Sequence, residues 1–128
     1  MTGVEEATSG VFIIGLGEIG CDLAARCYVP GSARRFVDFD PGALARFPAE
    51  EAVCLSADGD RTDEMDCEAM RAAGQRAGRQ LAEQAAGKLV LLVVAAGGQT
   101  ATVVAPAIAS ELRGGGAKTI ALVLEPLP

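Results

Sequence analysis

Two glycine-containing loops, each following a short apolar run, carry the residue types and spacing best suited to binding an anion. The first loop is GLGEIG, residues 15–20, in which Gly15, Gly17 and Gly20 have the G-x-G-x-x-G spacing. This spacing allows a tight turn, a close backbone approach and a helix whose first N–H groups face a phosphate. The same glycines also suit a strand-to-helix turn that packs tightly and binds nothing.

The second loop is AGGQTAT, residues 96–102, which follows the uninterrupted apolar run Leu89–Ala95. Two glycines end that run, and two threonines, Thr100 and Thr102, precede a helical pattern. A strand, a glycine–threonine loop and a helix N-terminus in this order present backbone N–H groups to a phosphate. The alternative is that the threonine hydroxyls only cap the helix.

Acidic residues form two further groups. Asp38 and Asp40 follow a second apolar run and precede a Pro-Gly turn signal. In an NAD-type domain, an acidic residue about 20 positions past the glycines binds the ribose hydroxyls, whereas Asp in a turn often bonds only its own backbone. The run DGDRTDEMD, residues 58–66, matches no ion-binding loop and predicts a solvated loop.

The composition excludes several function classes. The 128 residues include no histidine, which removes the commonest general base and the commonest metal ligand. The net charge of −6 argues against binding of nucleic acid or an anionic membrane. The cysteines at 21, 27, 54 and 67 form no C-x-x-C pair and indicate reduced thiols in the cytoplasm. No apolar stretch approaches the roughly 20 residues of a membrane span.

Apolar runs alternate with helical patterns along the chain. Strands are expected at 11–15, 36–39, 52–56, 89–95 and 119–124, and helices at 20–28, 43–47, 64–86 and 104–112. Ile19, Leu23 and Cys27 are expected to face inward from the first helix. The small residues of the long helix, including Gly74 and Gly78, are expected to let it lie close to a sheet. The alternation predicts an α/β, Rossmann-like three-layer sandwich with a five-stranded parallel sheet in the order 3-2-1-4-5.

In such a sheet, ligands bind beyond the strand C-termini where the strand order reverses. GLGEIG and AGGQTAT are therefore expected to face one another across one crevice.

Residues 11–126 together resemble the nucleotide-binding half of the tubulin/FtsZ family. The resemblance is carried by GLGEIGCDL, by FVDFDPGAL and above all by AAGGQTATVVAP with the glycine-rich turn and AKTIALVLEP that follow. Seven residues stand at the positions of the family signature G-G-G-T-G-[ST]-G: Gly97, Gly98, Gln99, Thr100, Ala101, Thr102 and Val103.

The resemblance implies binding of GTP or GDP with magnesium, hydrolysis completed by a neighbouring subunit, and head-to-tail growth of filaments of the cytoskeletal and cell-division type. It implies that Asp38 and Asp40 lie near the magnesium or the phosphates. The nucleotide-binding residues that it implies are Gly15, Gly17, Glu18, Gly20, Cys21, Asp22, Asp38, Asp40, Gly97, Gly98, Gln99, Thr100, Ala101 and Thr102.

The sequence departs from the family pattern in four places. Gln99, Ala101 and Val103 replace signature glycines. The acidic run 58–66 stands where the family has a glycine-rich phosphate-facing loop. In the first loop, glycines of bacterial relatives are replaced by Glu18 and Ile19, and their asparagine by Asp22. The chain also ends after the fifth strand, without counterparts of the base-binding segments, the central helix and the activation domain with its catalytic acidic loop.

Three functions remain open at this point. The first is a divergent tubulin/FtsZ-like guanine-nucleotide-binding domain, formed by residues 11–128 after a flexible tail 1–10, that has no GTPase activity alone because no residue suits a catalytic base. The second is an NAD(P)-type nucleotide-sensing module. The third is a nucleotide-free module for assembly or interaction. The fifth strand is expected to be a sheet edge that self-associates or is covered by a continuation of the chain.

Overall fold

Five parallel strands form one sheet in the order β3-β2-β1-β4-β5, which confirms the predicted topology. The computed structural model describes residues 10–27, 29–56 and 66–125. The strands are β1 (Val11–Leu16), β2 (Ala33–Asp38), β3 (Ala52–Cys54), β4 (Leu89–Ala95) and β5 (Lys118–Leu124). The bounds of β4 are those that its uninterrupted apolar run predicts, because both faces of this strand are covered.

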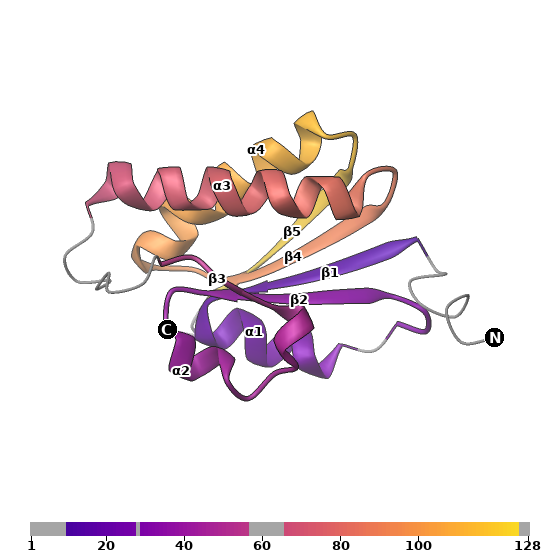
Figure 1. Ribbon diagram of the computed structural model, residues 1–128, viewed down its shortest axis with the longest axis horizontal. Coiled ribbons are helices and arrows are strands. Elements are labelled where there is room, and N and C mark those ends of the chain that lie inside the picture. The colour runs from indigo at the N-terminus through magenta and orange to yellow at the C-terminus, as the bar shows by residue number, and fades with distance from the viewer. Residues whose placement is uncertain (1–9, 28, 57–65, 126–128) are drawn as a thin grey trace.

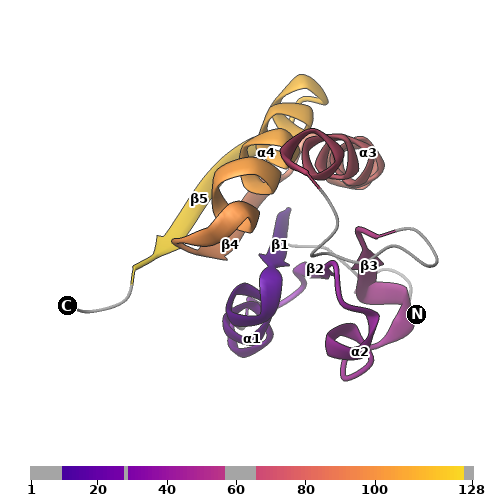
Figure 2. The same ribbon diagram turned by 90° about the vertical axis from the view of Figure 1, so that its left-hand side faces the viewer.

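Helices cover both faces of the sheet and make three layers (Figure 1). The helices are α1 (Gly17–Arg26), α2 (Pro41–Leu44), α3 (Cys67–Ala85) and α4 (Ala105–Gly114), with a 3-10 helix at Ala49–Glu51 and a π-helix at Thr100–Val104. Figure 2 shows α3 and α4 together on one face and α1 with α2 on the other. The connections thus cross the sheet on opposite sides before and after β3, and the strand order reverses between β1 and β4.

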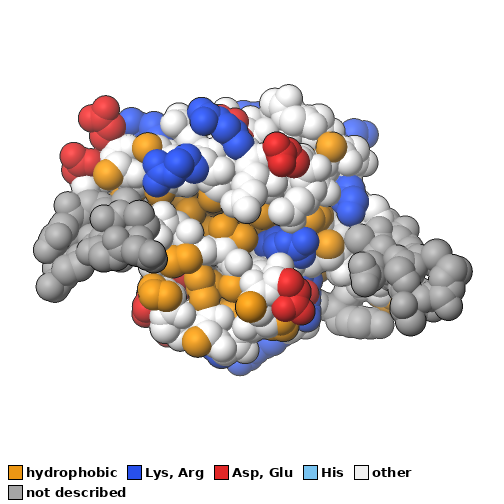
Figure 3. Space-filling model, in the orientation of Figure 1, with side chains coloured by type: hydrophobic (Ala, Val, Ile, Leu, Met, Phe, Trp, Pro, Cys, Tyr) orange, Lys and Arg blue, Asp and Glu red, His pale blue; other side chains and the backbone are white. Residues whose placement is uncertain are grey.

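The larger core lies between the sheet and the α3–α4 layer. Val104, Ile108 and Leu112 point into it from the start and inner face of α4 and are fully buried, as their four-residue spacing predicts. A smaller core lies on the opposite face, around Ile13 and Phe36. Viewed from the β3 side, hydrophobic side chains form a band between α3 and α2 (Figure 3).

The buried face of α1 differs from the prediction. Gly20, Cys21 and Ala24 are its buried residues, whereas 55% of Ile19 is exposed. The four-residue spacing of the larger apolar side chains therefore predicted the wrong buried face for α1. The small residues face inward because α1 lies almost in contact with the backbone of the sheet.

The small residues of α3 also have a different neighbour from the one predicted. An ideal Cβ on Gly74 would lie 3.0 Å from the Cβ of Ala107, and one on Gly78 would lie 2.8 Å from the Cβ of Glu111. Both contacts are with α4, so the two glycines permit close packing between helices rather than between α3 and the sheet. The helix begins at Cys67, capped by the side chain of Asp66.

Two predictions concern residues outside the described ranges. They are the flexible tail, apart from Gly10, and the acidic run 58–66, apart from Asp66. Among the described helices, none combines the length and the apolar character that crossing a membrane requires.

Candidate functional site

A crevice lies where β1 and β4 end side by side. Leu16 of β1 is paired with Val94 of β4, so the loops that follow the two strands start from the same edge of the sheet. A pocket of about 190 Å³ opens there. Its lining comes from both loops and from the last strand residues: Leu16, Gly17, Glu18, Ile19, Val94, Ala95, Gly97 and Thr100. The prediction that the two loops face one crevice is confirmed.

The three glycines of the first loop have separate structural reasons. Gly17 has a φ of +77°, which a residue with a side chain adopts only with strain. A Cβ on Gly15 would lie 2.7 Å from the Cα of Cys21, and one on Gly20 would lie 2.4 Å from the carbonyl oxygen of Val93. The G-x-G-x-x-G spacing is thus accounted for by one turn and two close backbone contacts.

The second loop turns through two consecutive glycines, with φ of +93° at Gly97 and +76° at Gly98. A Cβ at either position would meet no atom within 4 Å, so both positions border open space. The two loops approach closely, since an ideal Cβ on Gly17 would lie 3.6 Å from the Cγ2 of Thr100. Gly97 and Gly98 are therefore needed for the positive φ angles of the turn, and the space beside them is open to the crevice.

The two helices that begin at the crevice lack side-chain caps. No side chain caps α1, which starts after Leu16, or the π-helix, which continues a helical turn that begins at Gly98. By contrast, α2 and α3 are capped by Asp40 and Asp66. First-turn N–H groups have no intrahelical partner and carry the positive end of the helix dipole. The crevice thus receives two sets of N–H groups suited to an anion.

The acidic residues of α1 are Glu18, which lines the crevice, and Asp22. The guanidinium of Arg46 forms an ion pair with Asp22 and donates a hydrogen bond of 3.4 Å to the carbonyl oxygen of Glu18. Arg46 also stacks over the ring of Phe47 at 4.6 Å. Among the lining residues of the crevice, Glu18 carries the single charge, and none of them is a lysine or arginine.

Cys21 faces the interior. Its Sγ lies 3.4 Å from the carbonyl oxygen of Gly15 and 3.5 Å from that of Val37, so the one thiol hydrogen is shared between these two acceptors, and the residue is 1% exposed. Burial raises the pKa of this thiol to about 12. The side chain is therefore a neutral core group, and only its backbone is left to contact a ligand.

Asp38 and Asp40 lie at the end of β2, next to β1, and neither lines the crevice. A carboxylate oxygen of Asp38 accepts from the N–H of Phe39 at 2.7 Å and from that of Asp40 at 3.4 Å. Asp40 in turn accepts from the N–H of Gly42 at 2.9 Å. These bonds account for both residues as turn and cap formers, and a role toward ribose or magnesium stays a prediction.

The replaced signature glycines cause no strain in this chain. Gln99 has a φ of −76°, and Ala101 and Val103 lie within the π-helix that follows it. Both of these side chains pack against the main core. The amide of Gln99 donates to Sγ of Cys67 at 3.5 Å and so contacts the start of α3. Ala101 and Gln99 thus point away from the crevice, unlike Thr100.

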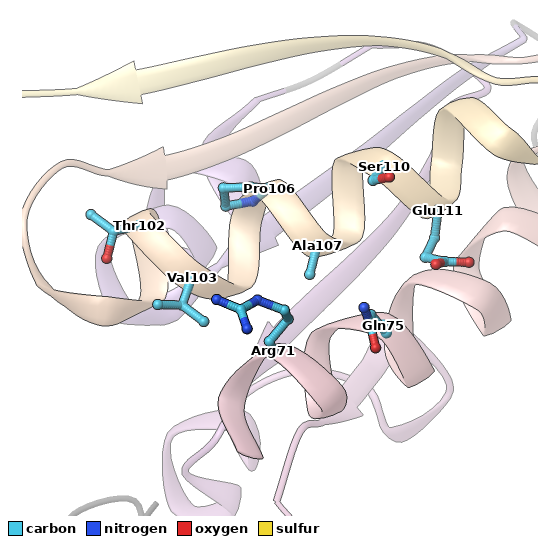
Figure 4. Close-up of a pocket in the computed structure, with 8 residues that line it drawn as sticks. All are labelled: Arg71, Gln75, Thr102, Val103, Pro106, Ala107, Ser110 and Glu111. Atoms are coloured by element: carbon cyan, nitrogen blue, oxygen red, sulfur yellow. The ribbon is translucent and has the colours of Figure 1, made fainter. Parts of the chain in front are cut away.

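Thr102 does not cap a helix N-terminus. Its hydroxyl donates to the carbonyl oxygen of Gly98 at 3.1 Å, which closes the loop on itself. Its side chain lies at one end of a groove between α3 and α4, of about 350 Å³, where the guanidinium of Arg71 extends toward Val103 (Figure 4). Arg71 was not predicted as a site residue, because the groove that it lines forms only where α3 packs against α4, a helix far away in the sequence.

The residues that sequence reasoning missed at the crevice are apolar. Ile19 was assigned to the buried face of α1, Leu16 was part of the GLGEIG loop but was not named as a binding residue, and Val94 and Ala95 were considered only as strand residues. The sequence could have identified these residues, because the crevice lies at the carboxyl ends of the strands where the strand order reverses, and the last residues of those strands border it. Within the described ranges, no cluster of three or more acidic or cysteine side chains is placed to hold a metal ion.

Solved structures with a similar fold cover most of this chain. A protofilament of TubZ from bacteriophage PhiKZ matches with a TM-score of 0.68 and 17% identity, over 89% of this chain and 37% of that one. A monomeric subunit of TubZ from the same phage matches with a TM-score of 0.69 and 15% identity, over 89% and 41%. CetZ from Methanosaeta thermophila strain DSM 6194 matches with a TM-score of 0.67 and 11% identity, over 88% and 36%.

The chain therefore spans 36% to 41% of the length of these structures. No protein-family model and no curated protein matches the sequence. At this level of identity the likeness concerns the fold, and the fold of this chain is the one that TubZ and CetZ, of the tubulin/FtsZ family, share.

Proposed function

We propose that the crevice between β1 and β4 binds the phosphate groups of a guanine nucleotide, and that this chain does not hydrolyse the nucleotide by itself. The observation that carries the proposal is the pair of uncapped helix N-termini at the crevice, set against the Asp-capped α2 and α3. Backbone N–H groups of this kind bind phosphate without a lysine or arginine.

The shape of the crevice limits what it holds. A volume of about 190 Å³ lies below the roughly 300–1,000 Å³ usual for small-molecule sites. It fits phosphate groups and leaves the nucleoside to bind along the adjoining surface. A magnesium ion bound with the nucleotide would offset the repulsion between the phosphates and the Glu18 carboxylate. The fold likeness to TubZ and CetZ is the reason for preferring a guanine nucleotide over NAD.

Thermal unfolding in the presence of ligand tests the proposal. GTP, GDP, ATP and NAD are each added at millimolar concentration, with and without magnesium. A ligand present at 100 times its dissociation constant stabilises the folded state by about 2.7 kcal/mol. We expect GTP and GDP to raise the midpoint. A response to NAD alone would favour the dinucleotide-sensing function, and no response to any of the four would refute nucleotide binding.

A pair of variants with equal charge locates the site. Thr100→Glu adds a carboxylate at the crevice and is expected to abolish the midpoint shift with GTP. Ser110→Glu adds the same charge on the exposed face of α4 and is expected to leave the shift unchanged. Phosphate release should stay at background for the unmodified chain. Release above background that Thr100→Glu abolishes would refute the absence of GTPase activity.

A second candidate, a nucleotide-free assembly module, has its own support. The crevice is small, its single charged lining residue is Glu18, and the apolar Ile19 is exposed beside it. These features suit a protein contact better than a triphosphate. One of the solved structures with this fold is a protofilament, in which copies of TubZ assemble. The ligand screen separates the two candidates, because the assembly module predicts no response.

A further inference from the structure

The groove between α3 and α4 has a volume of about 350 Å³. This volume is within the roughly 300–1,000 Å³ usual for ligand sites, whereas the crevice between β1 and β4 is smaller. Every residue that lines the groove is exposed or partly exposed. The groove is therefore open to solvent along its length and accessible to a ligand.

Arg71 of α3 is the charged residue at one end of the groove. Figure 4 shows its guanidinium extending toward Val103 at the start of α4. Arg71 forms no hydrogen bond, ion pair or ring contact with any residue in the described ranges. A guanidinium presents its N–H donors in a planar fork that matches the two oxygens of a carboxylate. This end of the groove is thus suited to a carboxylate.

An ion pair between Glu111 of α4 and Arg79 of α3 closes the other end of the groove. Nε of Arg79 lies 3.5 Å from Oε1 of Glu111, and the arginine side chain is 67% exposed. The pair neutralises the one carboxylate among the lining residues. Between Ala69 and Ala82, α3 carries three arginines and no acidic residue, although the net charge of the chain is −6. The groove is thus locally positive in an acidic protein.

The wall between the two arginines is mostly apolar. Pro106 and Ala107 of α4 form it, and the methyl group of Ala107 is directed toward Gln75 of α3 (Figure 4). Within the described part of the chain, neither Gln75 nor Ser110 makes a side-chain hydrogen bond. The middle of the groove therefore offers an apolar contact, together with an amide and a hydroxyl that can bond a peptide backbone.

The separation of the two arginines matches the repeat of an extended peptide. Residues 71, 75 and 79 lie on one face of α3, and a span of eight helical residues is about 12 Å long. In an extended chain, alternate side chains point the same way and each residue advances about 3.3 Å. Side chains four residues apart therefore point to the same side at a separation of about 13 Å. The side chain midway between them points to that side as well.

We propose that this groove binds an extended acidic segment of a partner protein, with the pattern acidic–x–apolar–x–acidic. One carboxylate pairs with Arg71 and the other with Arg79, and the apolar side chain between them lies against Ala107. Gln75 and Ser110 bond the peptide groups of the segment. Charge complementarity selects this occupant. A small carboxylate would gain one exposed ion pair, which contributes little, whereas a peptide segment combines two ion pairs with an apolar contact.

Fluorescence anisotropy with a labelled peptide tests the proposal. The probe is Glu-Thr-Leu-Thr-Glu, flanked by glycines and blocked at both ends, in which threonine favours the extended form. We expect saturable binding with a dissociation constant of about 1 mM or below, weakened by added salt. The control peptide Thr-Glu-Leu-Glu-Thr has its carboxylates only about 7 Å apart, and is expected to bind roughly fivefold more weakly. No saturable binding of the probe, or equal binding of the two peptides, would overturn the proposal.

Two variants with the same change of charge locate the site. Arg71→Gln removes the guanidinium from the groove and is expected to weaken binding of the probe roughly fivefold, as the loss of one exposed ion pair predicts. Arg76→Gln removes the same charge from an exposed position of α3 outside the groove, and is expected to leave binding nearly unchanged. Circular dichroism checks that both variants fold. Equal effects would show that the peptide responds to net charge alone, and would refute the site.

A second pair of variants separates the groove from the crevice. Ser110→Glu adds a carboxylate to the groove and is expected to weaken binding of the acidic probe, whereas Thr100→Glu adds one to the crevice and is expected to leave it unchanged. This result does not depend on whether the crevice binds a nucleotide. An effect of Thr100→Glu without one of Ser110→Glu would place the peptide at the crevice and refute the proposal.

Sedimentation of the chain without peptide tests the identity of the occupant. The proposal predicts a mass of 13.0 kDa that Arg71→Gln does not change. A dimer that Arg71→Gln dissociates would assign the groove to a second copy of this chain and would overturn binding of a partner protein.

Discussion

The substitution Gly20→Ala tests whether the first loop keeps its glycines for packing. Gly20 is in the first turn of α1, directly against the end of β4. An ideal Cβ there would lie 2.4 Å from the carbonyl oxygen, 3.2 Å from the carbonyl carbon of Val93 and 3.3 Å from the Cα of Val94. All three atoms belong to the backbone of a central strand, so no side-chain rotation can relieve the contact.

Two opposing terms set the magnitude. Alanine is favoured over glycine in a helix by about 1 kcal/mol. Overpacking a well-packed core costs typically about 1–3 kcal/mol and occasionally more. Because the Cβ is more than half an ångström inside the usual contact limit and the obstacle is rigid, the overpacking term takes the upper part of its range. We expect a net loss of about 2 kcal/mol of unfolding free energy, which lowers the midpoint temperature by roughly 6–10 °C for a domain of this size.

Urea and thermal unfolding without ligand measure this loss. Gly114→Ala is the matched control, because that helical glycine has no atom within 4 Å of an ideal Cβ. The control is expected to be neutral or stabilised by up to about 1 kcal/mol. If Gly20→Ala were as stable as Gly114→Ala, α1 would have room to move from β4, and the packing explanation of the G-x-G-x-x-G pattern would be refuted.

Three further substitutions test other contacts. Gly78→Ala should lower the urea midpoint, because the overpacking cost of a Cβ 2.8 Å from that of Glu111 exceeds the gain of about 1 kcal/mol in helix propensity; a raised midpoint would contradict the close α3–α4 contact. A double-mutant cycle on Asp22 and Arg46 should give a coupling of about 0.5 kcal/mol that molar salt removes, since both side chains are nearly half exposed. For Cys21 the folded thiol has the higher pKa, about 12 against 9.0 when unfolded. Its contribution to stability is therefore complete below pH 9 and lost as the pH rises toward 12. The stability difference between the unmodified chain and Cys21→Ala should shrink above pH 9, and a difference independent of pH would show that the thiol ionises freely in the folded state.

The architecture was predictable because it depends on local patterns. An uninterrupted apolar run such as 89–95 indicates a strand covered on both faces, and its length is that of a strand rather than a helix. The alternation of such runs with helical segments leaves few topologies, because crossovers between parallel strands are right-handed. The meeting of the two glycine loops at one crevice follows from that order, and the structure confirms it.

Residue roles at the site were less predictable, because they depend on what packs opposite. The apolar spacing on α1 pointed to Ile19 as a buried residue, yet β4 approaches so closely that only small residues fit on the inner face. One carboxylate oxygen of Asp38 accepts from the next two backbone N–H groups, a local contact that the sequence did not specify, and a ligand role for Asp38 stays a prediction. Gln99 and Ala101 stood at glycine positions of the family signature, yet a π-helix needs no positive φ there.

By itself the sequence determined the number and order of the strands and the edge at which the loops meet, since hydrophobic periodicity and chain connectivity are properties of the chain alone. The bounds of β2, expected at 36–39 and found at Ala33–Asp38, were not determined in this way. The tertiary structure decided which glycines contact a neighbouring backbone and which helix N-termini are left uncapped. Those outcomes depend on distances between segments far apart in the chain. A close contact such as that of Gly20 with Val93 exists only once α1 and β4 have packed together.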